Sequence, residues 1–351
     1  MKLDEFLALT PQDLGNLQAL DFAYGTNLFL LTSLEFIDFC QKLSQCVNLR
    51  TLNLAHTFPA GGVFAQTQLP VLTLEQQNEL ASVFYRSIAK LQKLVDVNFS
   101  HCELHFNLFG FQCFCHALVQ LSKLQTLNLS YVGTQVGNID LPGIAGLTSI
   151  AAGNFFSLLA FDAFKQEFCS TLPRLRNLQE LDLSGNSLHT LEIYREVRRE
   201  NTHFGYAHSF CNLSEALVQC SALRILKLED NKFDHIRSNE GYTGLCSALK
   251  KCLEQCPNLQ ELHVGRNYLS NDRKKMLQDM MITHNAQVAI PRQEAKAFLL
   301  SWNRLRDQEQ PITLGALSKI LVQDILTAGG YLQISPAGAF EMVRRPLHIR
   351  F

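Results

Sequence analysis

The 351-residue sequence has almost no net charge, because 31 Lys and Arg residues are balanced by 32 Asp and Glu residues. A nucleic-acid-binding protein usually carries a clear excess of basic residues, so this class of function is disfavoured. No run of 18 apolar residues occurs, and the sequence therefore predicts no membrane-spanning helix. The first residues mix acidic and apolar side chains and lack a basic segment followed by a long apolar run, so we expect no secretion signal peptide.

Sequence motifs of the common catalytic sites are also missing. The chain contains no G-x-S-x-G, no H-E-x-x-H and no C-x-x-C, and it lacks both glycine-rich phosphate motifs. We therefore expect a protein that is not an enzyme and that needs no cofactor. The eleven cysteines fall mostly in apolar patterns at helical spacing. Without a secretion leader, this usage predicts reduced, buried thiols in a cytosolic protein.

Leucine, by contrast, is abundant, with 59 of the 351 positions. Many of these residues belong to a repeated pattern, L-x-x-L-x-L-x-x-N/C, in which the L-x-L alternation predicts a strand with one buried face. The ninth residue points inward and bonds the turning backbone; it is Asn or Cys in four of the seven copies, so the first, second and fourth turns are degenerate. The seven copies begin at Leu17, Leu49, Leu94, Leu124, Leu178, Leu223 and Leu259.

This pattern resembles the leucine-rich repeat family over roughly residues 17–290. The likeness is most specific in LQELDLSGNSL (178–188) and LRILKLEDNKF (223–233). Apolar residues at helical spacing precede the strands, which is similar to the ribonuclease-inhibitor type of repeat. The resemblance implies an α/β fold: a leucine-rich repeat solenoid, or horseshoe, with a parallel sheet on the concave side and helices on the convex side. Because one repeat cannot bury its own leucines, the units must stack.

We predict two regions, an irregular leucine-rich repeat domain over 1–290 with about seven to eight repeats and a helical extension over 291–351. The copies begin 30 to 54 residues apart, which is longer than a repeat of about 28–29 residues needs. The excess must form insertions, and loops on a rigid scaffold often carry recognition. The largest candidates are 58–73, 131–157, 187–208 and 232–240.

The end of the repeat domain is expected to be closed by further elements. Segment 271–285 reads as the last helix, with Asn271 or Asp272 as its N-cap. A short strand over 287–290 is expected to close the sheet. The apolar helix predicted over 312–328 would cap the last repeat, as solenoids require. The tail over 331–351 is expected to be partly disordered.

The residues between the leucines of each strand are expected to face the open side of the sheet. Neighbouring strands lie about 4.8 Å apart, so equivalent residues form contiguous columns. The flanking column begins with two Tyr and two His, and we expect it to bind a partner because Tyr is an efficient contact residue. The Asn residues of the central column either bond a partner or satisfy one another across strands. The central column reads Asp21, Asn53, Asn98, Asn128, Asp182, Lys227 and His263, and the flanking column reads Tyr24, His56, His101, Tyr131, Gly185, Asp230 and Arg266.

His56 and His101 are expected to be neighbours in this column. A zinc site needs three or four converging ligands, and the nearest cysteine, Cys102, belongs to the inward position. We therefore expect no metal.

The chemistry that remains is protein recognition by a non-catalytic, monomeric scaffold. Irregular repeats, abundant Phe, Gln and Asn, and a short helical extension resemble leucine-rich repeat effectors of Legionella-type intracellular bacteria. That resemblance implies delivery by type IV secretion into the host cytosol and a host protein partner. One alternative is the substrate receptor of a ubiquitin ligase, in which helix 312–328 docks an adaptor in the manner of a BC-box. Another is an inhibitor of a second effector or enzyme.

Overall fold

The computed structural model describes most of the repeat region and three short strands near the C-terminus. The segments 58–72, 133–161, 189–208 and 281–331, which contain most of the predicted insertions and the predicted helix 312–328, lie outside the described residues. The described residues are 1–24, 28, 31–57, 73–102, 108–132, 162–186, 188, 209–235, 239–256, 258–280, 332–334, 340–342 and 348–350.

The sheet follows the leucine pattern, and the predicted parallel order is confirmed. Seven three-residue strands pair in sequence order, each parallel to the next, and an eighth strand joins at the end. The central residue of each of the seven is a Leu or Val that is no more than 1% exposed, and these residues lie in register. The strands are β1 (Ala19–Asp21), β2 (Thr51–Asn53), β3 (Asp96–Asn98), β4 (Thr126–Asn128), β5 (Glu180–Asp182), β6 (Ile225–Lys227) and β7 (Glu261–His263).

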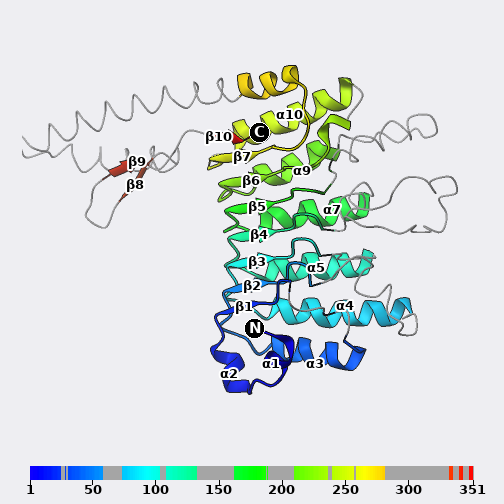
Figure 1. Ribbon diagram of the computed structural model, residues 1–351. Helices are drawn as coiled ribbons and strands as arrows, with labels where there is room; N and C mark the ends of the chain where they lie inside the picture. The colour runs from blue at the N-terminus through cyan, green and yellow to red at the C-terminus, as the bar shows by residue number, and fades with distance from the viewer. Residues whose placement is uncertain are drawn as a thin grey trace, which may run out of the picture.

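Helices cover one face of this sheet and leave the other face open (Figure 1). Each helix packs against the helix of the next repeat, as in α3 with α4 and α9 with α10. The two short helices at the N-terminus pack against α3. The helices are α1 (Leu3–Leu7), α2 (Pro11–Asn16), α3 (Ser33–Leu43), α4 (Leu74–Ala89), α5 (Leu108–Gln120), α7 (Asp162–Thr171), α9 (Ser209–Val218) and α10 (Asn239–Gln255), with 3₁₀ turns η2 (Leu172–Arg174) and η3 (Phe233–His235).

Local sequence explains where several helices begin. A Thr side chain accepts a hydrogen bond from the backbone N–H three residues later, and an acidic or amide side chain at that position bonds back, at the starts of α2, α3 and α4. These capping boxes satisfy donors that a helix leaves unpaired at its first turn. The helices then bury the apolar face that the sequence predicts, for example Phe36, Phe39, Cys40 and Leu43 in α3.

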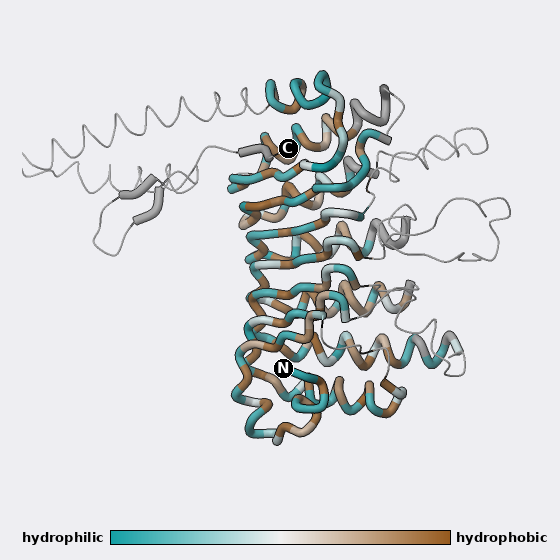
Figure 2. Tube along the Cα trace, viewed as in Figure 1, coloured by the Kyte–Doolittle hydropathy of each residue, from teal (hydrophilic) through white to brown (hydrophobic). Residues whose placement is uncertain are grey.

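A single hydrophobic core runs along the stack between the sheet and the helices. Aromatic rings join its first units, since Phe6, Phe22 and Phe39 contact one another at centroid distances of 5.4 to 5.7 Å. In Figure 2, hydrophobic and hydrophilic residues alternate along the strands and helices, as expected when each element buries one side. The repeats therefore form a solenoid; the horseshoe curvature stays a prediction.

The ninth residue of the repeat works as the sequence predicts wherever it is Asn. Asn231 donates from Nδ2 to the carbonyl of Leu183 in the preceding repeat and accepts the backbone N–H of Asn186. Asn267 repeats this arrangement one unit later. At the Cys position, the Cys102 thiol donates to the carbonyl of Leu54. At the degenerate second turn, the Thr57 hydroxyl donates to that same carbonyl, 2.6 Å away.

The C-terminal part differs from its prediction in two respects. A helix does begin at Asn271, but Ser270 precedes it and caps it, because the Arg273 N–H donates to the Ser270 hydroxyl. The predicted caps Asn271 and Asp272 are therefore wrong. Strand β10 (His348–Arg350) pairs in parallel with β7 at the end of the sheet. The tail also contains an antiparallel pair, β8 (Leu332–Ile334) and β9 (Phe340–Met342).

The described part of the chain contains no helix that is long and apolar enough to cross a membrane. The predicted closing strand over 287–290 lies outside the described residues.

Candidate functional site

Four aromatic rings form a continuous stack along the edge of the open face. Tyr24 and His56 have ring centroids 4.2 Å apart, His56 and His101 are also 4.2 Å apart, and His101 and Tyr131 are 4.6 Å apart. The last two contacts are close to parallel, at 11° and 5°. We call these four residues the aromatic ladder. The contiguity predicted for the flanking column is thus confirmed for its first four members, while their role in binding stays a prediction.

The backbone places each ladder residue in the same unusual conformation. All four have a positive φ, between 54° and 58°, which non-glycine residues rarely adopt. Their backbone N–H groups donate to a carbonyl of the next repeat, for example His101 to Ser130 at 2.9 Å. The rings therefore repeat at the spacing of the sheet and contact one another.

Five residues of the central column bond the turn that leads into the flanking column. The side-chain oxygen of Asn53, Asn98 or Asn128 accepts the backbone N–H two residues later, at 2.8 to 3.1 Å. Asp21 and Asp182 do the same. Such Asx turns fix the chain just before the ladder residue. The alternative that these asparagines satisfy one another across strands is therefore wrong: their oxygens serve their own turns.

One end of the ladder is closed by the next two members of the flanking column. A Cβ atom on Gly185 would lie 2.3 Å from the Tyr131 ring, so the ring lies directly over this glycine. The Tyr131 hydroxyl donates across it to Asp230, at 2.9 Å. Burial, together with this bond to the Asp230 carboxylate, raises the pKa of Tyr131, and Arg266 opposes the shift. Gly185 thus has a steric role that its place in the sequence column does not reveal.

His101, in the middle of the ladder, is a poor candidate for positive charge. Burial, and secondarily the neighbouring His56, lowers the pKa of His101. The described residues contain no group of three or more His, Cys, Asp or Glu that could hold a metal ion. The lowered pKa favours the neutral form of the His101 imidazole, which suits a contact group.

The last repeats carry charges that are already paired within the chain. Lys227 forms an ion pair with Glu180 of the neighbouring strand. Burial lowers the pKa of Lys227, but the hydrogen bond to Glu180 and the negative charges of Glu180, Asp182 and Glu229 together outweigh it, and the net shift is upward. His263 lies 2.9 Å from the Glu261 carboxylate and is largely buried. Lys227 and His263, both predicted to contact a partner, are thus also used in holding the face together.

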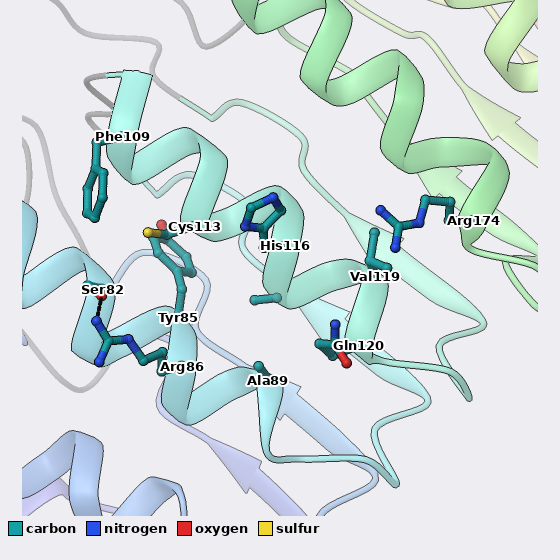
Figure 3. Close-up of a pocket in the computed structure, with 11 residues that line it drawn as sticks. Ser82, Tyr85, Arg86, Ala89, Phe109, Cys113, His116, Val119, Gln120 and Arg174 are labelled. Carbon is teal, nitrogen blue, oxygen red and sulfur yellow. Dashed lines mark hydrogen bonds between the residues drawn. The ribbon is translucent and has the colours of Figure 1, made fainter.

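A pocket that was not predicted from the sequence lies between helices α4 and α5 (Figure 3). It is open, about 550 Å³ in volume, and is lined by Cys113 and His116 among others. Arg86, another of the lining residues, donates to the Ser82 hydroxyl (Figure 3). Burial raises the pKa of the Cys113 thiol despite the nearby Arg86. The thiol therefore stays protonated, and this pocket lacks an activated nucleophile.

Comparison with known proteins agrees with the repeat pattern. The family model for the Leucine Rich Repeat matches residues 177–195. No curated protein matches. The fold is thus an α/β solenoid of leucine-rich repeats, as the strands and turns of the chain itself show.

Three solved structures with some likeness are distant in sequence and in fold similarity. A TLR13–ssRNA13 complex is 16% identical, covers 74% of this chain and 27% of that chain, and has a TM-score of 0.31. An internalin from Listeria monocytogenes is 11% identical, with coverages of 74% and 64% and a TM-score of 0.23. A leucine-rich repeat protein of Leptospira interrogans is 15% identical, with coverages of 76% and 83% and a TM-score of 0.19. The chain thus spans less than two thirds of the first two proteins.

Proposed function

We propose that the protein is a non-catalytic scaffold that binds a partner protein on the open face of its sheet, at the aromatic ladder. The observation that carries this proposal is the stack of four rings on a surface that the described helices leave uncovered. Tyr24, at its outer end, is 81% exposed. Large, rigid aromatic side chains supply contact area at low entropic cost, and they dominate binding energy at many protein interfaces.

The setting of this interaction is a second part of the proposal. We place the protein in a host cytosol as an effector secreted by a bacterium, on the strength of its resemblance to Legionella-type effectors. The ten described cysteines, which are thiols and mostly buried, suit a reducing compartment. The ubiquitin-ligase alternative depends on helix 312–328, outside the described residues. An inhibitor would use the same open face.

Affinity capture from host-cell lysate, followed by mass spectrometry, tests the proposal. The wild-type chain is compared with a ladder variant in which Tyr24, His56, His101 and Tyr131 are all changed to Ala. A matched control changes four exposed apolar residues elsewhere in the molecule. These are Leu34, Val47, Tyr268 and Met276, which are 38% to 79% exposed.

We expect the ladder variant to lose partners that the control variant keeps, with both variants melting as a single transition. Partners that survive in the ladder variant and disappear in the control would move the binding surface away from the open face. Partners kept by both variants would contradict a role for the ladder.

A further inference from the structure

The open face carries far more negative charge than the protein as a whole. We count four columns of residues on this face. Two are the first and the third residues of strands β1 to β7, a third is the flanking column, which consists of the ladder followed by Gly185, Asp230 and Arg266, and the fourth is the residue just before each member of the flanking column. These columns hold seven carboxylates and two Lys or Arg residues, a balance of −5, in a chain whose formal net charge is −1. The carboxylates are Asp21, Asp96, Glu180, Asp182, Glu229, Asp230 and Glu261, and the cations are Lys227 and Arg266.

The two cations do not compensate this charge across the face. Lys227 forms an ion pair with Glu180. Arg266 interacts with the Tyr131 hydroxyl, which itself donates to Asp230. Among the described residues, no cation forms an ion pair with Asp96, Asp182 or Glu229. Burial and the negative charge of Glu180 raise the pKa of Asp96. Lys227 also interacts electrostatically with Asp182 and Glu229, but one cation cannot neutralise Glu180, Asp182 and Glu229 together. The centre of the face therefore keeps an excess of negative charge.

The aromatic ladder adds a second feature that favours a particular cation. Its Tyr131 end is closed by Asp230 and the guanidinium of Arg266. Its Tyr24 end is open and exposed. The Asp21 carboxylate lies on the same repeat and uses only its Oδ1 atom in the local turn. An exposed aromatic ring in a repeat that also carries a carboxylate can receive a guanidinium, which stacks flat and donates hydrogen bonds better than an ammonium does.

We propose that the partner presents a basic, arginine-bearing polypeptide segment to this face, with one guanidinium against Tyr24 and further cations over the carboxylates of β3, β5 and β6. The inference rests on the proposed function and names the chemistry of its partner. A polyanion such as RNA is repelled by the same surface. A basic segment of a second copy of this chain is the competing occupant, and the experiment separates it.

Fluorescence polarisation with labelled nona-arginine, nona-lysine and nona-glutamate peptides tests the inference on the full chain. At about 0.15 M salt, we expect nona-arginine to bind more tightly than nona-lysine and nona-glutamate to show no binding. The face variant Asp96→Asn, Asp182→Asn, Glu229→Gln should weaken nona-arginine binding by roughly tenfold or more. Asp182→Asn preserves the local turn, because Asn makes the same turn in β2, β3 and β4.

The control removes the same three negative charges from the helical side, through Asp38→Asn, Glu79→Gln and Glu254→Gln. We expect less than about a twofold change in the control. Tyr24→Ala should weaken nona-arginine more than nona-lysine. Equal losses in the face and control variants would show that the peptides sense only overall charge, and this would overturn the inference.

Two further outcomes separate the inference from the proposed function. If the ladder variant loses its cellular partners while the face variant keeps them, the result supports the protein-binding scaffold and contradicts the proposal of a basic partner. If the ladder variant keeps its partners, the scaffold proposal itself fails. Sedimentation of the protein alone decides between occupants: self-association that the face variant abolishes would assign the surface to a second copy and overturn a foreign partner.

Discussion

Gly185 leaves room for the last ring of the aromatic ladder to contact a charged residue of a later repeat. It occupies the ladder position of β5 with φ at +69°, and the absence of a side chain makes room for the Tyr131 ring. The hydroxyl of that ring then reaches Asp230, two repeats further along the sheet. A glycine that serves a neighbouring ring in this way is invisible in a column read from the sequence.

Gly185→Ala should displace the Tyr131 ring and destabilise the fold by about 1–3 kcal/mol, because the added methyl overpacks a filled site and a side chain at this positive φ strains the backbone. Denaturant unfolding measures the loss. Gly15→Ala is the matched control, because nothing lies within 4 Å of the added atom; in helix α2 it should stabilise by roughly 0.5–1 kcal/mol. An unchanged free energy of unfolding for Gly185→Ala would show that the ring is not held over the glycine.

His101 should make stability depend on pH in a defined direction. In the folded state, the pKa of His101 lies below its ordinary value of 6.5, so the unfolded chain binds more protons as the pH falls. The contribution of His101 to the free energy of unfolding is fully present above pH 6.5. It declines as the pH drops from there towards the lowered pKa of His101 in the folded state. His101→Gln should flatten this decline in melting temperature, while His116→Gln, outside the ladder, should leave it intact.

The residue scale also shows where sequence reasoning stops. The period of two in each strand and the common register predicted that Tyr24, His56, His101 and Tyr131 would adjoin. The Asx turns were missed, because an Asn oxygen can bond either a partner or its own backbone. A second set of asparagines, just before the first leucine of a repeat, was also missed. Asn48, Asn177 and Asn258 each donate to a carbonyl of the preceding repeat, at 2.6 to 2.7 Å.

At the scale of an element, helix α3 illustrates how a start signal and an apolar stripe act together. Thr32 accepts the Glu35 N–H, and the Glu35 carboxylate accepts the Thr32 N–H at 2.7 Å. The Thr32 hydroxyl also donates to the Glu35 carboxylate, at 2.8 Å, and the two bonds that this carboxylate accepts from Thr32 lower the pKa of Glu35. The stripe was predicted from its spacing. At the helix over 271–280, the sequence offered Ser, Asn and Asp in succession, and propensity alone could not choose among three good caps.

Thr32→Ala should destabilise the protein by about 1 kcal/mol, because the first turn of α3 loses its side-chain acceptor. Chemical denaturation at neutral pH measures the change. Ser33→Ala, one residue later and exposed, is the control and should have a much smaller effect. Equal effects of the two substitutions would contradict a specific capping role for Thr32.

At the scale of the whole molecule, the order of the stack follows from the period of the leucine pattern. Each repeat contacts chiefly its neighbours, so local patterns predicted the global fold. The insertions carry no such period. Within the predicted insertion 232–240 the structure has the 3₁₀ turn η3 and the start of α10, whereas most residues of the other insertions and of the helix predicted over 312–328 lie outside the described residues. The closing strand β10 escaped prediction because it comes from 85 residues beyond β7 in the sequence, a separation that repeat spacing cannot indicate.

Deleting residues 348–351 should expose the edge of β7. We expect a lower melting temperature and concentration-dependent self-association, since an unpaired strand edge can recruit another chain. Size-exclusion chromatography over a range of concentrations measures this. Arg350→Ala keeps the backbone of β10 and serves as the control. A deletion variant that stays monomeric and equally stable would show that β10 adds nothing to the sheet.

The parallel strand order also defines how the molecule responds to tension. The N-terminus lies beside β1 and the C-terminus lies at β10, at opposite ends of the stack (Figure 1). A pull on the two termini therefore acts along the direction in which the strands are stacked. The hydrogen bonds between each pair of neighbouring strands carry this force in series. Bonds loaded in series break at the weakest joint first, so the solenoid would extend one repeat at a time, as a chain of separable links.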